Sequence, residues 1–479
     1  MRILFRHSRK ATLSAAFCLL GPGAALAGTA FNSAPPPNAL QKKYYTYANQ
    51  AGGLKCEPKG KLKELVQEPN KCYLDLDECK AGRDAVGGAL DGSYKELFAD
   101  LLAVSAAKDK LAFEAACPGD GPQFLEGLGI QGLGYTQSKE HGALLAALAS
   151  EERVKQFSGA DQRATLVRAL WGAGDKETAI PALKRLVEAE ARTKSFKSLA
   201  LVALQRWGSD AGVEFCKGAL SSENDTGLLA SCVDYLGRMK VKEALPGIGR
   251  VLEKEPEVAL RALGQIGDPA SKATVSGWLT EKDTQNTMFK IPAWIALANL
   301  GDKSGMEAIN TVLDGRQPMN KKEQEKAKTA KKPAPPKEAD DRMIQAAVME
   351  TLNLDEKQWK AVTPKLQKLT KESDPKKWRV ALYANVALAQ RGDANAAKKL
   401  AAELENPKEE IRKSALDAVG GLDAAPGSNF MNRGLGVVAD PIIADAALKF
   451  YDAESKKDVK AKALQTAAAV RAASVNLKK

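Results

Sequence analysis

Histidine is almost absent from this chain: only His7 and His141 occur among 479 residues. Histidine is the commonest metal ligand in proteins and the commonest general acid or base near neutral pH. The chain therefore cannot build a metal site from several histidines. The acidic group Asp75, Asp77 and Glu78 lacks the spaced ligands and the glycine of a calcium loop, and it is typical of a solvated helix start. We expect no metal and no cofactor.

The apolar run near the N-terminus, "ATLSAAFCLLGPGAAL", is too short to span a membrane. It is broken at Gly21-Pro22-Gly23, whereas a spanning helix needs about 20 apolar residues. It follows the basic segment "MRILFRHSRK" and ends at Ala25-Leu26-Ala27, an order typical of a secretory signal peptide. We expect residues 1–27 to be removed on export to a periplasm or the extracellular space, leaving no integral membrane segment. Removal lowers the formal charge from +12 to +8.

Cysteine is scarce, but its number is even once the signal peptide is removed. The six that remain are Cys56, Cys72, Cys79, Cys117, Cys216 and Cys232. An even count in an exported chain permits disulfides. Cys72 and Cys79 do not form a C-x-x-C motif, so neither a thioredoxin-like motif nor a zinc knuckle is indicated. The first four cysteines predict a disulfide-stapled helical cap whose connectivity the sequence leaves open.

Internal repetition is the strongest pattern in the sequence. In five copies, an apolar residue follows a leucine by twelve positions and another follows it by sixteen. The copies are Leu204…Cys216…Leu220, Leu236…Ile248…Leu252, Leu263…Val275…Leu279, Leu297…Ile309…Leu313 and Leu388…Leu400…Leu404. Each unit predicts two short apolar helices, which bury too little surface to stand alone and must stack on their neighbours.

The turn within each unit contains a glycine followed by an aspartate. Glycine accepts the left-handed conformation that ends a helix, and aspartate accepts hydrogen bonds from the first N–H groups of the next helix. The turns are Gly174-Asp175, Gly267-Asp268, Gly301-Asp302 and Gly392-Asp393. We interpret these aspartates as helix caps and not as catalytic groups.

The segments "ALRALGQIGDPASKATVSGWL" and "AWIALANLGDKSGMEAINTVL" resemble HEAT repeats, in the short form that phycobilin lyases also contain. The resemblance covers residues 150–475 and implies an all-α fold, a right-handed α-solenoid of about eight helix pairs. It is unspecific for activity, because the family ranges from scaffolds to a few enzymes.

The domain boundaries follow changes in composition. We expect a signal peptide at 1–27, a flexible linker at 28–55 and the cysteine-containing helical cap at 56–150. HEAT-like repeats follow at 151–316 and again at 341–479, the latter ending in a C-terminal cap. Between them, residues 317–340 are rich in lysine and proline, without apolar periodicity, and are predicted to be a disordered insertion.

The repeat register also makes a prediction about Cys216 and Cys232. Cys216 occupies the slot of Ile248 and Val275, and Cys232 occupies a small-residue slot that holds Ala259 in another copy. Both side chains are therefore expected in the core, on consecutive antiparallel helices. Free cysteine packs well as a small hydrophobe, so two unpaired thiols are one reading. Export and the even count favour a disulfide between them.

Basic residues on the second helices of the repeats form a candidate partner-binding patch. In HEAT solenoids these helices usually line the concave side, and here they carry Lys184, Arg185, Lys217 and Arg250. These cations do not recur at one repeat position, as a phosphate-tracking stripe should. The alternative interpretation is that the lysines are spread over many solvent-exposed faces and form no binding patch.

The sequence favours a non-enzymatic function. We expect an exported scaffold or adaptor that binds another envelope protein on its concave surface, with no nucleic acid partner. Two alternatives stay open. One is a lyase-like or chaperone-like protein that handles a small ligand in the groove, which a buried polar cluster there would favour. The other is a binder of anionic envelope polymer.

Overall fold

The chain folds almost entirely into α-helices, as the repeat pattern predicted. The computed structural model describes residues 39–50, 53–66, 76–105, 122–156, 160–190, 194–282, 287–329, 337–372, 374–421 and 435–477. The signal peptide predicted at 1–27 lies outside these residues. Among the helices that they form, none has both the length and the apolar character needed to cross a membrane.

The N-terminal module packs short elements around an apolar core that is continuous with the core of the following helices. Its elements are α1 (Ala39–Tyr44), β1 (Tyr45–Gln50), β2 (Gly53–Pro58), α2 (Gly60–Val66), the 3₁₀ turn η1 (Leu76–Glu78), α3 (Lys80–Gly87), α4 (Ser93–Ser105) and α6 (Pro122–Tyr135). β1 and β2 pair antiparallel, from Tyr45 opposite Pro58 to Gln50 opposite Gly53. Phe98 of α4 is fully buried in the core.

The linker and disulfide predictions for this module differ in how they agree with the structure. Residues 39–55 were predicted to be flexible linker, but they contain α1 and most of the β-hairpin. The sequence signal that this prediction missed is the tyrosine-rich segment "YYTY" at residues 44–47, which suits a strand. Cys79 is buried and disulfide-bonded. The side chains of Cys56, Cys72 and Cys117 lie outside the described residues, so the connectivity of the predicted cap stays open.

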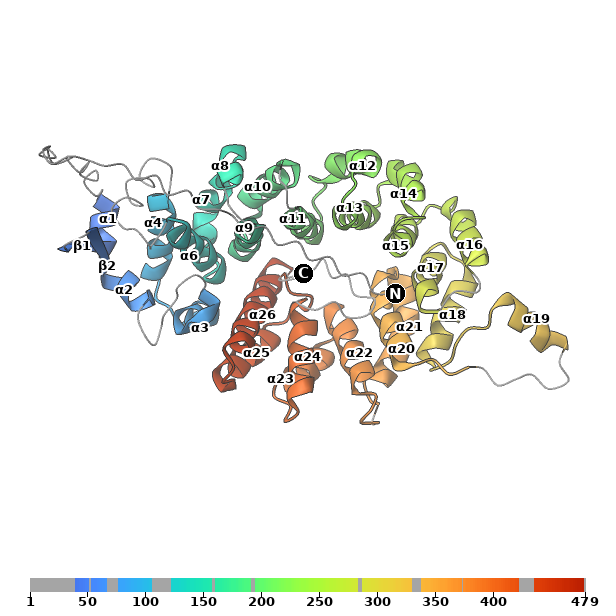
Figure 1. Ribbon diagram of the computed structural model, residues 1–479. Helices are drawn as coiled ribbons and strands as arrows, with labels where there is room; N and C mark the ends of the chain where they lie inside the picture. Colours follow the sequence, from blue (N-terminus) through green and yellow to red (C-terminus); the bar gives the residue numbers. More distant parts are fainter. Residues whose placement is uncertain are drawn as a thin grey trace, which may run out of the picture.

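From residue 142 onward the helices alternate between an inner and an outer position. The upper row in Figure 1 comprises α7 (Gly142–Ala147), α8 (Glu151–Gln156), α9 (Ala160–Ala173), α10 (Lys176–Glu188), α11 (Ser195–Arg206), α12 (Val213–Ser222), α13 (Thr226–Arg238), α14 (Leu245–Val251), α15 (Pro256–Ile266) and α16 (Ser271–Glu281). Of these, α9, α11, α13 and α15 lie on the inner side, and α10, α12, α14 and α16 lie on the outer side.

The chain then bends and returns as a lower row. Its helices are α17 (Thr287–Asn299) and α18 (Lys303–Leu313) at the bend, then α20 (Asp341–Glu350), α21 (Glu356–Leu369), α22 (Trp378–Gln390), α23 (Ala394–Leu404), α24 (Glu409–Gly420), α25 (Pro441–Ala453) and α26 (Lys457–Asn476). The 3₁₀ turn η4 (Thr351–Asn353) joins α20 to α21. Figure 1 shows the two rows facing each other across the middle of the molecule.

The inner helices form a closed ring. Each contacts the next in the order α9, α11, α13, α15, α17, α20, α22, α24 and α26, and α26 returns to contact α9. At this seam, Asn476 Nδ2 donates to the carbonyl oxygen of Trp171 at 2.6 Å, and Arg471 donates to the carbonyl oxygen of Val86. Arg83 of α3 also forms a two-point ion pair with Asp452 of α25. Contacts between residues 305 to 385 positions apart in the sequence therefore close the ring.

The predicted Gly-Asp turns are formed at all four positions. Their glycines have φ of 72 to 91°, the left-handed region that favours glycine. Asp302 and Asp393 accept backbone N–H bonds as the caps of α18 and α23, and Asp268 accepts from Ala270 N just before α16. Asp175 caps no backbone N–H and accepts from the Thr178 hydroxyl instead. The capping interpretation is confirmed for Asp302 and Asp393, whereas α16 and α10 have no side-chain cap.

The insertion between the repeats is not structureless, contrary to the sequence prediction. Residues 321–329 form a further helix, α19 (Lys321–Thr329), which projects from the bend in Figure 1. The base of the insertion is fixed by a bridge between Arg316 and Glu338, where Gln317 N donates to the carbonyl oxygen of Lys337 at 2.7 Å. Lysine, glutamate and alanine are good helix formers, which explains α19 despite its lack of apolar periodicity.

Candidate functional site on the inner face of the ring

A ladder of polar side chains lies on the inner helices of the upper row and on α17 at the bend. Each member stands two positions after the repeat leucine: Arg206, Arg238, Gln265 and Asn299 follow Leu204, Leu236, Leu263 and Leu297. All four reach across to backbone or side-chain groups of the lower row. The sequence contains a signal for this ladder, because a polar residue recurs two positions after each of these repeat leucines. The ladder was not predicted because only the apolar positions of the repeat were compared.

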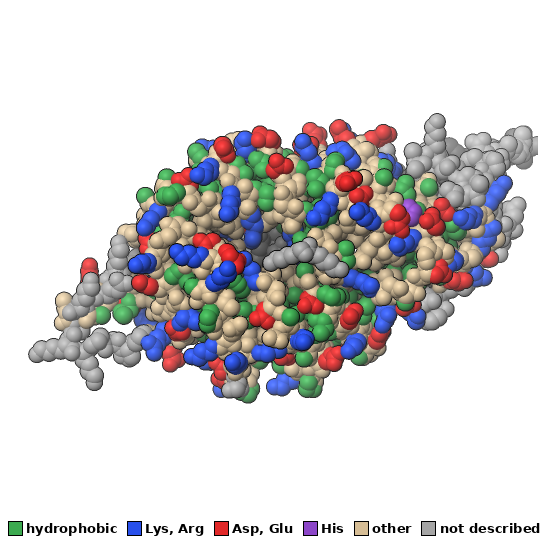
Figure 2. Space-filling model, turned by 180° about the vertical axis from the view of Figure 1, so that it is seen from behind, with side chains coloured by type: hydrophobic (Ala, Val, Ile, Leu, Met, Phe, Trp, Pro, Cys, Tyr) green, Lys and Arg blue, Asp and Glu red, His purple; other side chains and the backbone are tan. Residues whose placement is uncertain are grey.

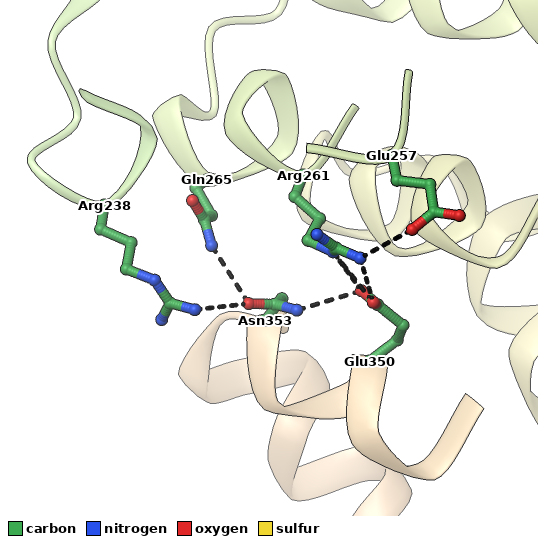
Figure 3. A network of polar contacts seen from close by, with 6 residues as sticks. All are labelled: Arg238, Glu257, Arg261, Gln265, Glu350 and Asn353. Carbon is green, nitrogen blue, oxygen red and sulfur yellow. Dashed lines mark hydrogen bonds and ion pairs between the residues drawn. The ribbon is translucent and has the colours of Figure 1, made fainter. Parts of the chain in front are cut away.

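Asn353 of η4 is the point where three of these side chains converge, and Figure 3 shows two of them, Arg238 and Gln265. Its Oδ1 accepts from Arg238 Nη2 at 3.0 Å and from Gln265 Nε2 at 3.2 Å. Its carbonyl oxygen accepts from Asn299 Nδ2 at 2.8 Å, and its own Nδ2 donates to Glu350 at 3.0 Å. One amide at the end of α20 thus connects α13, α15 and α17.

A buried ion pair lies beside this amide. Arg261 Nε donates to both carboxylate oxygens of Glu350 at 2.9 Å, and the Glu350 side chain is only 2% exposed. Burial alone lowers the pKa of Arg261, but the charge and hydrogen bonds of Glu350 outweigh that effect, so the pKa is raised. The pair is a two-point contact, and each buried charge is stabilised by the opposite charge of its partner.

Unlike Arg261, Arg206 forms no ion pair with a carboxylate among the described residues. It donates to the carbonyl oxygens of Leu435 and Gly436 in the lower row, and its guanidinium lies 5.3 Å from the ring centre of Trp171. Burial, together with the nearby charge of Arg238, lowers its pKa to about 10. Arg391, which pairs with Glu356 at 3.7 Å, donates to the carbonyl oxygens of Leu352 and Leu354 within the lower row.

These contacts hold the two rows together. Hydrogen bonds join Arg238, Arg261, Gln265, Glu350 and Asn353 across the ring, and we call this group the clasp. A buried polar cluster was the feature expected to favour a small-ligand function. Here its hydrogen bonds are directed at the partner row, so the clasp accounts for closure and leaves few groups for a ligand.

The predicted partner-binding cations do not lie on this inner face. Lys184 and Arg185 are on α10, Lys217 is on α12 and Arg250 is on α14, all outer helices in Figure 1. The prediction assumed that the second helix of each unit is the inner one, whereas here the first helix is. Lys184 and Lys217 pair with glutamates of their own helices. Arg185 donates to the carbonyl oxygens of Ala146 and Ala149, a helix-end contact.

Cys216 and Cys232 are buried, as the register predicted, but they are free thiols and not a disulfide. Their side chains are hydrogen-bonded to each other, which places α12 and α13 in the predicted antiparallel contact. Burial and the neighbouring Cys232 raise the pKa of the Cys216 thiol well above its ordinary value. The core around them is apolar, so two thiols pack there as small hydrophobes.

A groove lined by both polar and apolar side chains opens at the bend between the rows. It encloses about 250 Å³ and is lined by side chains of α16, α17 and α18 together with Met319, which is 43% exposed. Met288 and Phe289, at the start of α17, are 36% and 48% exposed. Exposed methionine and phenylalanine beside a groove are typical of surfaces that bind protein segments. We call Met288, Phe289 and Met319 the bend patch.

The charges on the rear face of the molecule are mixed. Figure 2 shows lysine and arginine side chains interspersed with aspartate and glutamate over that face. Among the described residues, no three histidine, cysteine, aspartate or glutamate side chains gather as a metal site would require.

The sequence matches no protein-family model and no curated protein.

Proposed function

We propose that the chain is an exported, non-enzymatic scaffold built as a HEAT-like solenoid closed into a ring, which binds another protein of a bacterial envelope. The repeat register and the paired helices support the solenoid, and the signal-like N-terminus supports export. The clasp and the α26 seam support a rigid frame, because both join parts of the chain that lie far apart in sequence.

The bend patch is the surface that carries this proposal. The inner face is occupied by contacts between the rows, so a partner has better access to the outside of the ring than to its centre. The bend patch consists of three exposed large apolar side chains, of which Met319 lines the groove. Exposed apolar groups of this size gain free energy when a partner removes them from water.

Site-directed photocrosslinking in intact cells tests this proposal. A photoreactive phenylalanine analogue replaces Phe289 in one variant and Lys217, on the outer helix α12, in a matched control. We expect a discrete protein adduct at position 289 and none at 217. Adding Met319→Lys to the first variant is expected to abolish the adduct, because a charge then enters the groove.

The partner-binding patch predicted from the sequence is tested in the same cells. Lys184, Lys217 and Arg250 are reversed to glutamate, and Arg185 is left in place because it anchors α7. Capture through position 289 is expected to survive this change. If the charge reversals abolish capture while Met319→Lys does not, the partner binds the outer cations and the bend patch is the wrong surface.

A further inference from the structure

The inner helices α11, α13 and α15 each carry one arginine, and these three arginines differ in their partners. Arg238 of α13 pairs with Asp234 at 3.2 Å, and Arg261 of α15 pairs with Glu350 at 2.8 Å. Arg206 of α11 pairs with no carboxylate in the described part of the chain. The inner face at α11 therefore carries a positive charge that is neutralised at the other two positions.

This charge lies inside the protein. Helices surround Arg206, although the residue keeps part of its surface accessible, and its guanidinium lies against the buried ring of Trp171. Burial and, after it, the charge of Arg238 lower the pKa of Arg206 to about 10, so the group stays protonated at neutral pH. A charge withdrawn from water without an opposite charge is unfavourable, and a like charge nearby adds to the cost. A bound anion offsets both effects.

The guanidinium of Arg206 has one edge that ring closure does not use. Its Nη1 donates to the carbonyl oxygens of Leu435 and Gly436, whereas Nε and Nη2 donate to no residue that the structure describes. The N–H groups of Nε and Nη2 lie along one edge of the planar guanidinium. Two parallel donors of this kind match two oxygens of a carboxylate or a phosphate group. The contacts to the lower row explain Nη1, and the other edge suits an oxyanion.

Two indole N–H groups of the same cluster also lack acceptors. The rings of Trp171 and Trp207 are 4.9 Å apart, and Trp207 directly follows Arg206 in the sequence. The Nε1 atom of each indole is buried and has no hydrogen-bond partner among the described residues. Buried donors without a partner are rare in folded proteins. Donors therefore outnumber acceptors around Arg206, an imbalance that an oxyanion corrects.

We propose that Arg206 binds a small oxyanion on the inner face of the ring through its Nε–Nη2 edge. The ligand carries two oxygens on one atom, as a carboxylate or a phosphate does, and the charge of Arg238 adds to the attraction. Figure 1 shows α11 well away from the bend, so this site is separate from the bend patch and does not depend on the proposed partner there.

Inorganic phosphate and acetate are the probes, each added to the full chain in Tris chloride at constant ionic strength. Calorimetry measures binding, and a ligand specific for the folded state raises the melting temperature. Phosphate also stabilises proteins generally, because it is excluded from their surface. We therefore expect a rise that saturates with phosphate or acetate, and no saturable rise with added chloride. The tighter of the two probes identifies the ligand class as a phosphate or a carboxylate.

Arg206→Lys locates the site, because lysine keeps the positive charge and loses the two-donor edge. This change is expected to weaken binding of the tighter probe about tenfold or more, the size typical for losing a charged hydrogen bond. The matched control is Arg250→Lys, at an exposed arginine of the outer helix α14. It is expected to leave the affinity unchanged.

Chemical protection gives a second measurement that needs no variant, should Arg206→Lys weaken the closure of the ring. Phenylglyoxal modifies accessible guanidinium groups, and peptide mapping follows each arginine separately. We expect a saturating concentration of the tighter probe to slow the modification of Arg206 and to leave that of Arg250 unchanged.

Any of three results overturns the proposal. The first is the absence of saturable heat and of a saturable shift in melting temperature with both probes. The second is equal affinity in the wild type and in a cooperatively melting Arg206→Lys variant, which places the anion elsewhere. The third is modification of Arg206 that is the same with and without the probe, including no modification in either case, which shows that the anion does not reach this edge.

Discussion

Glu350, at the end of α20, and Arg261, in the middle of α15, are joined by nitrogen–oxygen contacts of 2.8 and 2.9 Å across the centre of the ring. The two residues are separated by 89 positions in the sequence. Their contact is one of the links that turn a curved stack of helices into a closed frame.

Glu350→Ala is expected to destabilise the protein strongly. The change leaves the Arg261 guanidinium buried without its carboxylate, a loss of about 3 to 5 kcal/mol for a broken buried pair. Chemical denaturation at pH 7 measures it. The matched control is Glu257→Ala, because Glu257 contacts the same arginine at 3.4 Å but is 51% exposed. Exposed pairs contribute about 0 to 1 kcal/mol. Equal losses in the two variants would mean that the clasp is not the buried pair described here.

Asp302 is expected to stabilise the fold as a helix cap with a defined pH dependence. It accepts from Ser304 N at 3.0 Å and pairs with Lys272 at 2.9 Å. Lys272, then Ser304, lowers its pKa below the ordinary 3.8. Because the folded pKa is the lower one, the stabilisation is complete above pH 3.8 and is lost as the pH falls through the folded value.

Asp302→Ala is therefore expected to cost about 1 kcal/mol at pH 7, with the difference from the wild type shrinking below pH 3.8. Urea denaturation over a pH series measures both quantities. Asp175→Ala is the control, since Asp175 occupies the same turn without accepting a backbone N–H bond. A difference that grew on acidification would contradict the assignment.

Much of this fold was accessible from the sequence because local rules determine it. The repeat register placed Cys216, Ile248 and Val275 in one kind of slot, and all three are fully buried. The glycines of the Gly-Asp turns adopt the left-handed conformation that their position required. Periodicity reports which face of a helix is apolar and where the helix ends, and these are the properties that it predicted here.

The closure of the ring could not be predicted in the same way. Asp77 meets Gln465 and Trp171 meets Asn476 across hundreds of residues, and no local pattern specifies such pairs. The cations on α10, α12 and α14 were assigned to the concave side by analogy, and that assignment depends on which helix of each pair turns inward.

Cys216 and Cys232 are expected to behave as inert thiols in the folded protein. Both are fully buried, and burial raises the pKa of Cys216, so little reactive thiolate forms near neutral pH. Alkylation of the native protein at pH 8 followed by peptide mapping should leave both unmodified. Alkylation after denaturation without reductant should modify both. Recovery of the two peptides as a linked pair would restore the disulfide that the sequence suggested.

The last prediction follows from the closed ring. A site-specific protease sequence inserted after Thr329, at the end of α19, permits a single cut between the rows. The two fragments are expected to stay together on gel filtration, because they share the α17–α20 contact, the clasp and the α26–α9 seam. Combining the cut with Glu350→Ala and Asn476→Ala removes the main polar links and is expected to promote separation. An open stack, held only at the bend, would predict that these two changes have no effect on the cut protein. Uncut protein carrying both substitutions is the control, and it should elute as an intact, folded chain.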